Sequence, residues 1–267
     1  MPITPGRPAA PSLCRIGLAL ALAAPLPAAG GGAEETAGDT QTTAEFELSI
    51  RGIPAGRLQL GSNENARSYS AAARMSATGF VGLIVALRYD AQVQGLKSGD
   101  DTGLAPSRYE ADIDSGRRKT RTLIDYPDGT PEVRVMRSDP PREPSDTPVD
   151  PASQTDALDP LTAMWLVMRP VPRADACALD LAVFDGQRRS ALRHTGAERT
   201  GAGLVCTAGL RRVAGYSRED MAEREVFALR MVYAPVAAPD GEDAGDLVHL
   251  VEAEVDSRYG IARLKRR

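Results

Sequence analysis

Histidine, cysteine and aromatic residues are scarce in this chain. Its 267 residues include two histidines, three cysteines, one tryptophan and only 4% aromatic residues. His194 and His249 both lie in segments typical of strands, and neither belongs to a recognisable catalytic or zinc-binding motif. The patterns G-x-S-x-G, G-x-x-x-x-G-K-[ST] and H-E-x-x-H are absent. The sequence therefore predicts no catalytic residues, no metal site and no cofactor, and leaves open an enzyme whose site is assembled from residues distant in the chain.

The chain also lacks an apolar run long enough for a stable membrane anchor, which needs about 20 residues. Its most apolar stretch, residues 16–24, follows Arg7 and Arg15 and is itself followed by small residues. This order of charged, apolar and small residues is typical of a secretory signal. We therefore expect residues 1–33 to be a signal peptide, residues 34–44 to be a disordered lead-in, and the protein to be periplasmic without a transmembrane anchor.

The chain has no excess of positive charge either. Cleavage could follow Ala28 or Ala33; cleavage after Ala33 leaves about 234 residues and changes the net charge from −4 to about −6. An acidic chain is repelled by a phosphate backbone, so we do not expect nucleic acid as a partner. The remaining length suits one β-rich domain over residues 45–267.

Two of the three cysteines remain after removal of the signal, which contains Cys14. An even pair in an oxidising compartment favours a disulfide, so we expect Cys177 and Cys206 to be bonded. Loop-closure entropy assigns such a bond roughly 3–4 kcal/mol.

Alternating apolar and polar residues predict a series of strands. The clearest example is 45–51, where Phe46, Leu48 and Ile50 share one face. Turn residues separate similar segments at 57–60, 68–77, 80–93, 107–113, 120–126, 132–136, 177–184, 187–194, 203–213, 225–233, 247–256 and 259–264. Regularly spaced strands of this kind are typical of an antiparallel sandwich or barrel.

One helix is predicted after a proline-rich loop at residues 138–156. Asp159 is a suitable cap, Pro160 occupies the first helical position and Pro170 ends the helix. An apolar stripe follows at helical spacing, formed by Leu161, Met164, Trp165 and Met168. This stripe can pack on the sheet, line a ligand pocket, or do both.

Two basic clusters lie near predicted turns, at residues 117–121 and at Arg188 and Arg189. Either could attract an anionic head group. A solvated hairpin tip is the interpretation that we favour for both.

Several motifs in order resemble the DUF3108 family of exported bacterial proteins. They are Asp159-Pro160-Leu161-Thr162-Ala163, Val183-Phe184-Asp185-Gly186, Cys206, Ala214-Gly215-Tyr216 and Tyr259-Gly260. The resemblance covers the chain from about Glu45 onward. It implies a mainly β, periplasmic protein and supplies no catalytic residues.

Together these patterns predict an all-β, mainly antiparallel fold: a curved sheet or incomplete barrel with one helix packed across it. A sheet that curls around a helix tends to leave a cavity. We therefore expect the protein to bind or carry a lipid or other apolar small molecule of the envelope, in a pocket near Trp165, Met164, Met168, Leu161, Phe80 and Leu83. The alternatives are an assembly factor that contacts an envelope protein partner, and an envelope enzyme.

Overall fold

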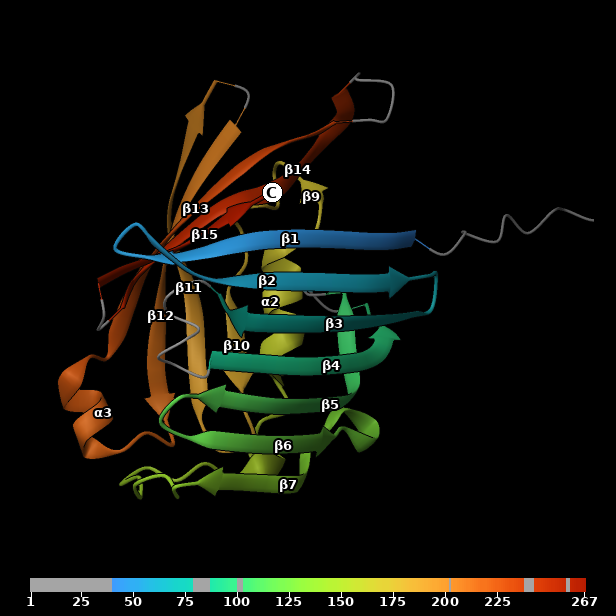
Figure 1. Cartoon of the computed structure of the whole chain (residues 1–267). Coiled ribbons are helices and arrows are strands. Elements are labelled where there is room, and N and C mark those ends of the chain that lie inside the picture. The colour runs from blue at the N-terminus through green and yellow to red at the C-terminus, as the bar shows by residue number, and fades with distance from the viewer. Residues whose placement is uncertain (1–39, 79–86, 100–102, 202, 238–242, 258–259) are drawn as a thin grey trace, which may run out of the picture. The chain divides into compact units, whose positions relative to one another are not determined.

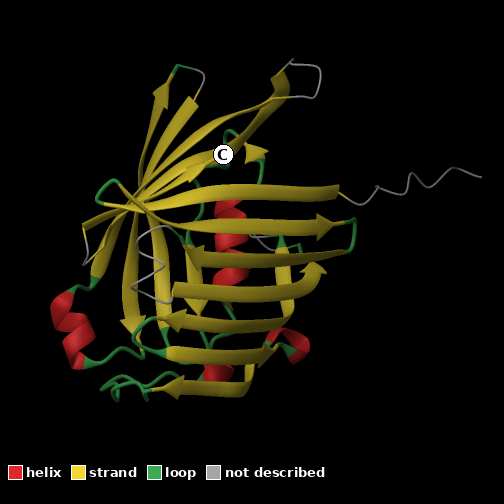
Figure 2. Cartoon of the chain, in the orientation of Figure 1, coloured by secondary structure: helices red, strands yellow, loops and turns green. Residues whose placement is uncertain are grey.

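A computed structural model describes residues 40–78, 87–99, 103–201, 203–237, 243–257 and 260–267. Strands dominate these residues (Figure 2). The strands are β1 Thr40–Ile50, β2 Ile53–Glu64, β3 Ser68–Ala77, β4 Leu87–Lys97, β5 Leu104–Ser115, β6 Lys119–Asp125, β7 Glu132–Asp139, β8 Ala157–Leu158, β9 Val171–Pro172, β10 Leu181–Phe184, β11 Arg189–Thr200, β12 Gly203–Ala214, β13 Val226–Ala237, β14 Asp243–Ser257 and β15 Gly260–Arg266. The α-helices of the described residues are α2 Pro160–Met168 and α3 Arg218–Glu223, and the 3-10 helices are Pro127–Gly129 and Pro151–Ser153.

All of the described strands belong to one sheet. Its order is β7-β6-β5-β4-β3-β2-β1-β15-β14-β13-β12-β11-β10-β8, with β9 paired to β14. The pair β8–β10 is parallel and the other pairs are antiparallel. Because β1 pairs with β15, the two halves of the chain meet in the middle of the sheet. The expected all-β, mainly antiparallel fold is confirmed.

The sheet curls around α2. The helix contacts β3, β4 and β5 on one side and β10 and β14 on the other, and Figure 1 shows it behind β1–β7. The two ends of the sheet, β7 and β8, are not paired to each other. Gly186, in the turn between β10 and β11, instead packs against β6: a Cβ at this position would lie 3.1 Å from Cγ2 of Thr122. The result is the expected incomplete barrel with a helix across it.

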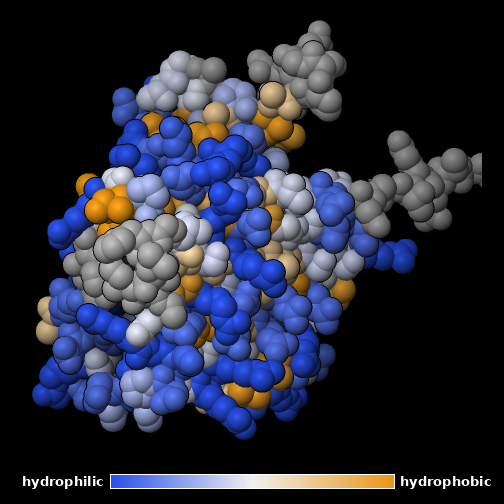
Figure 3. Space-filling model, viewed as in Figure 1, coloured by the Kyte–Doolittle hydropathy of each residue, from blue (hydrophilic) through white to orange (hydrophobic). Residues whose placement is uncertain are grey.

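The alternation predicted from the sequence determines which face is buried. In β1, Phe46 and Leu48 are buried and Glu47 between them is less so. The opposite face of β1–β7 is polar, and Figure 3 shows a largely hydrophilic surface over these strands. Arg74 and Asp90, for example, form an ion pair of 2.9 Å across β3 and β4. The apolar face of the sheet therefore points toward α2.

Some boundaries differ from those expected. Residues 40–44, expected in the lead-in, lie in β1, because they pair with β2 as far as Glu64. The expected signal peptide at 1–33 and the rest of the expected lead-in lie outside the described residues. Strand β10 begins at Leu181, so Cys177 lies in the segment before it rather than in a strand.

The proline-rich segment has no long element between β7 and β8, but it is tied to the rest of the domain. The carbonyl oxygen of Thr147 accepts a 2.8 Å hydrogen bond from the backbone N–H of Gly215. The carbonyl oxygens of Pro140 and Pro141 accept hydrogen bonds from the Arg118 side chain. Among the described residues, no helix is both long and apolar enough to cross a membrane.

Candidate functional site

Helix α2 occupies the centre of the candidate site. Asp159 precedes it, and its side chain accepts hydrogen bonds of 2.9 Å from the backbone N–H groups of Leu161 and Thr162. Pro160 occupies the first turn, where it removes no helical hydrogen bond. The helix thus begins as predicted, and its two faces meet different halves of the sheet.

The face toward β1–β7 is closely packed. Leu161 and Trp165 are buried there, and the indole Nε1 of Trp165 donates a 3.0 Å hydrogen bond to Oε1 of Glu64 at the end of β2. Tyr69 on β3 shares a 2.8 Å hydrogen bond with the Thr162 hydroxyl. This side of the helix is structural core.

The other face borders an apolar cleft of about 510 Å³. Pro160, Ala163, Met164, Val167 and Met168 line it from the helix. Opposite them are inward-facing residues of β11–β15, among them Leu192, Leu210, Leu229, Met231, Leu250 and Leu264. The volume falls in the range of small-molecule pockets, roughly 300–1,000 Å³.

Several cleft residues are only partly buried, although they point into the domain. Met164, Val167, Leu210, Leu229 and Leu264 all have this character. Apolar surface left in contact with water is unfavourable by roughly 25 cal/mol per Å². The cleft therefore offers apolar surface that a bound molecule could cover.

The expected pocket residues divide between the two faces. Met164 and Met168 line the cleft, whereas Leu161 and Trp165 lie on the packed face and do not. The helical repeat is the main physical reason: positions 161 and 165 project to one side, and 160, 163, 164 and 167 project to the other. Met168 follows the direction of position 161 but is the last residue of α2, and it also lines the cleft. Phe80 and Leu83 lie outside the described residues.

A buried polar cluster lies at the start of α2. Burial raises the pKa of Asp159 to about 6, although hydrogen bonds from Thr162 and the backbone favour its charged form. Burial also raises the pKa values of Tyr69 and Tyr126, and the negative charge of Asp159 adds to both shifts. Asp159 is fully buried, so its carboxylate acts as a helix cap rather than as a group that meets a substrate.

The cysteines form the expected disulfide, with Cα atoms 5.4 Å apart. His194 lies beside the disulfide. Among the described residues, Cys177, His194 and Cys206 are the group whose potential metal-ligand atoms lie close enough together for one ion. Because both sulfur atoms are in the bond, they supply no thiolate to a metal. The other histidine is His249. Burial lowers its pKa, and the positive charge of nearby Arg266 lowers it further. Neither histidine lines the cleft.

The polar end of the cleft was not identified from the sequence. Asp185, Arg188 and Ser190 line it next to the turn between β10 and β11. Ser190 is hydrogen-bonded to the hydroxyl of Tyr216 at 2.6 Å. Arg188 was expected at a solvated hairpin tip, yet its side chain is only 18% exposed. The Asp185-Gly186 turn was the available signal, because the Asp185 side chain accepts hydrogen bonds from the N–H groups of Gln187 and Arg188 and so fixes Arg188 relative to the turn.

Comparison with known proteins gives the family. The model of a family of unknown function, DUF3108, matches residues 45–220. The chain belongs to the DUF3108 family. The resemblance drawn from the sequence motifs is thereby confirmed, although the DUF3108 match ends before Tyr259-Gly260, and Tyr259 lies outside the described residues.

Among solved structures, the chain is similar to a β-barrel-like protein of the domain of unknown function DUF1849 from Brucella abortus. The two share 10% identity over 84% of this chain and 94% of that chain, with a TM-score of 0.43. No curated protein matches the chain.

Proposed function

We propose that this DUF3108 protein binds the apolar part of an envelope lipid or related small molecule in the cleft beside α2. The partly exposed apolar side chains inside the curled sheet carry this proposal, because a bound hydrocarbon chain would remove them from water. The contrast within one helix adds support: its face toward β1–β7 is filled by Leu161 and Trp165, and its other face is not.

We further propose that the protein works in the periplasm after removal of residues 1–33. The order of residues in that segment is typical of an export signal. The Cys177–Cys206 disulfide is compatible with the oxidising environment of that compartment. Binding in the cleft would then shield an apolar molecule as it crosses an aqueous space.

A chain-length series tests the binding proposal. Linear alcohols of increasing length should bind with an affinity that rises up to about fourfold per methylene, because each buried methylene contributes about 0.8 kcal/mol. Isothermal titration calorimetry measures the series, and the heat-capacity change of binding should be negative. An affinity that is independent of chain length would exclude an apolar site.

Two tryptophan variants locate the site. Leu210→Trp adds volume inside the cleft, so it should weaken binding of the longest alcohol by about tenfold or more. Leu96→Trp adds the same group at an exposed position of β4 away from the cleft and should leave affinity unchanged. Thermal unfolding of both variants controls for loss of structure.

A second candidate, an assembly factor that contacts a protein partner, is favoured by one exposed apolar pair. Ile53 and Ile261 are 58% and 55% exposed. The two segments are neighbours, because the backbone N–H of Arg51 in the β1–β2 turn donates a hydrogen bond to the carbonyl oxygen of Ile261. A photo-crosslinker at Ile53 tests this in the cell. A discrete crosslinked partner that is missing when the crosslinker is placed at Leu96 would favour the assembly factor.

A further inference from the structure

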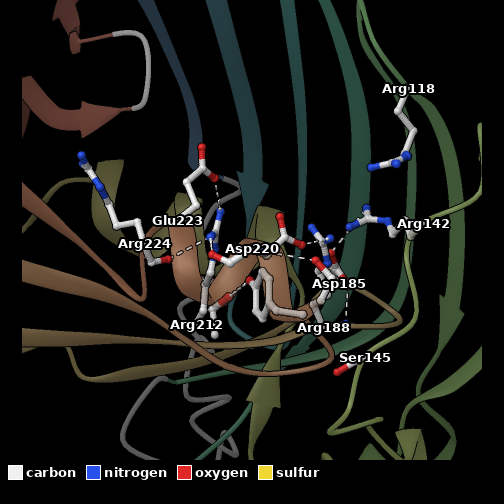
Figure 4. A network of polar contacts seen from close by, with 12 residues as sticks. Arg118, Arg142, Ser145, Asp185, Arg188, Arg212, Asp220, Glu223 and Arg224 are labelled. Atoms are coloured by element: carbon white, nitrogen blue, oxygen red, sulfur yellow. Dashed lines mark hydrogen bonds and ion pairs between the residues drawn. The ribbon is translucent and has the colours of Figure 1, made fainter.

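The cleft has one charged end, formed by the turn between β10 and β11. Asp185 and Arg188 both line the cleft at this end. The other lining residues are apolar apart from Ser190 and Glu254, and Glu254 is ion-paired with Arg263. Figure 4 shows the polar network around them, with Arg142 and Arg118 on one side of Asp185 and Arg212 on the other. A molecule with an apolar chain in the cleft would therefore meet charged groups at this end.

Arg188 is held in place but not fully paired. Its Nη2 donates a 2.8 Å hydrogen bond to Oδ2 of Asp220, and its guanidinium lies 4.7 Å from the centre of the Tyr216 ring. Its Nε is buried and has no hydrogen-bond partner among the described residues. An unsatisfied buried donor costs about 1–3 kcal/mol. The guanidinium of Arg188, which lines the cleft, therefore keeps donor capacity that its protein partners do not use.

Arg142 repeats this arrangement from the proline-rich segment. Its side chain is 12% exposed and its Nη2 lies 3.7 Å from Oδ2 of Asp185. Its Nε is also buried without a partner among the described residues. Burial lowers the pKa of Arg142, and the nearby charges of Arg188 and Arg118 lower it further, while Asp185 favours the charged form.

Positive charge exceeds negative charge at this end of the cleft. Arg142 is influenced by the charges of Arg188, Arg118 and Asp185. With Arg212, the network of Figure 4 holds four guanidinium groups near three carboxylates, those of Asp185, Asp220 and Glu223. Asp185 is itself engaged in the turn, where it accepts hydrogen bonds from the N–H groups of Gln187 and Arg188 at 3.0 and 2.7 Å. Guanidinium groups bind carboxylate and phosphate oxygens through paired hydrogen bonds.

We infer that the molecule bound in the cleft is an amphiphile with an anionic head group, a carboxylate or a phosphate, and that Arg188 and Arg142 hold this head group. The inference rests on the proposed binding function. The apolar chain lies along α2 and the head group lies at the β10–β11 turn, against Arg188, which lines the cleft, with Arg142 behind it beside Asp185. Asp185 opposes the head group electrostatically and so limits its affinity.

Two ligands with the same acyl chain test this inference. Oleoyl lysophosphatidic acid carries a phosphate, and monooleoylglycerol carries none. Titration of the full exported protein with each, below its critical micelle concentration, should give at least about tenfold tighter binding of the phosphate ligand. Raising the salt concentration should reduce this preference but not the binding of monooleoylglycerol.

Three variants assign the preference to residues. Arg142→Met should abolish most of the preference while leaving the affinity for monooleoylglycerol unchanged. Asp185→Asn keeps a side-chain acceptor for the turn and should increase the affinity for lysophosphatidic acid severalfold. Arg74→Met removes the same charge from the polar outer face and should change neither affinity.

The outcomes separate the inference from the function on which it rests. Equal affinity for the two ligands would overturn the anionic head group and keep the apolar site. Binding of neither ligand would overturn both. Binding of inorganic phosphate alone as tightly as lysophosphatidic acid would show a simple phosphate site and would also overturn the inference, because the acyl chain would then contribute nothing.

Discussion

The hydroxyl of Thr162 donates a 2.6 Å hydrogen bond to the Asp159 carboxylate, in a part of the interior where neither residue is exposed to solvent. The same hydroxyl is hydrogen-bonded to Tyr69 on β3. The first turn of α2 is therefore joined to the sheet through a buried polar chain of three residues. The orientation of the helix, and hence the cleft on its other face, depends on this connection.

Asp159 should make stability depend on pH. Burial raises its pKa to about 6 in the folded protein from an ordinary value of 3.8. The folded state then binds more protons than the unfolded state between these values, so the free energy of unfolding should increase as the pH falls from 7 to 4, by at most about 3 kcal/mol. Urea unfolding of the wild type and of Asp159→Asn across this range measures the difference.

Asp159→Asn removes the titrating group but keeps an acceptor for the cap, so its free energy of unfolding should lack this increase. Asp128→Asn is the matched control on an exposed 3-10 turn and should follow the wild type. Parallel curves for the wild type and Asp159→Asn would show that the buried carboxylate does not titrate in this range.

Thr162→Val tests the polar chain itself. Valine keeps the shape of threonine but leaves the Tyr69 hydroxyl and one Asp159 oxygen without their partner. We expect a loss of about 2–3 kcal/mol in the free energy of unfolding. Thr207→Val, at an exposed position of β12, should change it by less than about 0.5 kcal/mol. Equal effects of the two substitutions would refute the role of the buried hydroxyl.

Removal of the disulfide should destabilise the protein without changing its fold. The bond closes a loop over a sequence separation of 29 residues, which corresponds to about 3–4 kcal/mol of loop entropy. Chemical denaturation of the double variant Cys177→Ala/Cys206→Ala measures this loss.

In the wild type, mass spectrometry should detect alkylation of Cys177 and Cys206 only after reduction. Labelling without a reductant would contradict the disulfide in the isolated protein.

Processing of the N-terminus should define the mature protein. We expect protein recovered from the periplasm to begin at Ala29 or Glu34, because the segment before each has the small residues that signal cleavage requires. Intact-mass measurement after reduction distinguishes these two ends. Recovery of a chain that still carries residues 1–33, from the cytoplasmic fraction alone, would contradict export.

Local signals in the sequence account for the parts of the structure that were predicted. Alternation around Phe46 and Leu48 indicates a strand with one buried face, and Asp159-Pro160 indicates the start of a helix. Both patterns involve residues close together in the chain. The disulfide was also predictable, because Cys177 and Cys206 are the only cysteines left after the expected cleavage.

The remaining features depend on contacts between distant segments. Alternation does not indicate how strongly the sheet curls, so the sequence pattern does not distinguish the face of α2 that packs from the face that borders the cleft. For this reason the pattern alone does not exclude Trp165 from the pocket. Arg142 lies in a segment that reads only as a proline-rich loop, and its position beside Asp185 follows from the tertiary fold. Residues 40–44 become a strand because β2 extends far enough to pair with them.

Native mass spectrometry of protein extracted gently from the periplasm shows whether the cleft beside α2 holds a molecule. Wild-type protein should carry a copurifying amphiphile whose mass is absent from Leu210→Trp purified in parallel, while Leu96→Trp should retain it. Ligand-free wild-type protein in repeated preparations, or an identical bound mass on Leu210→Trp, would contradict the claim that the cleft beside α2 holds an apolar molecule.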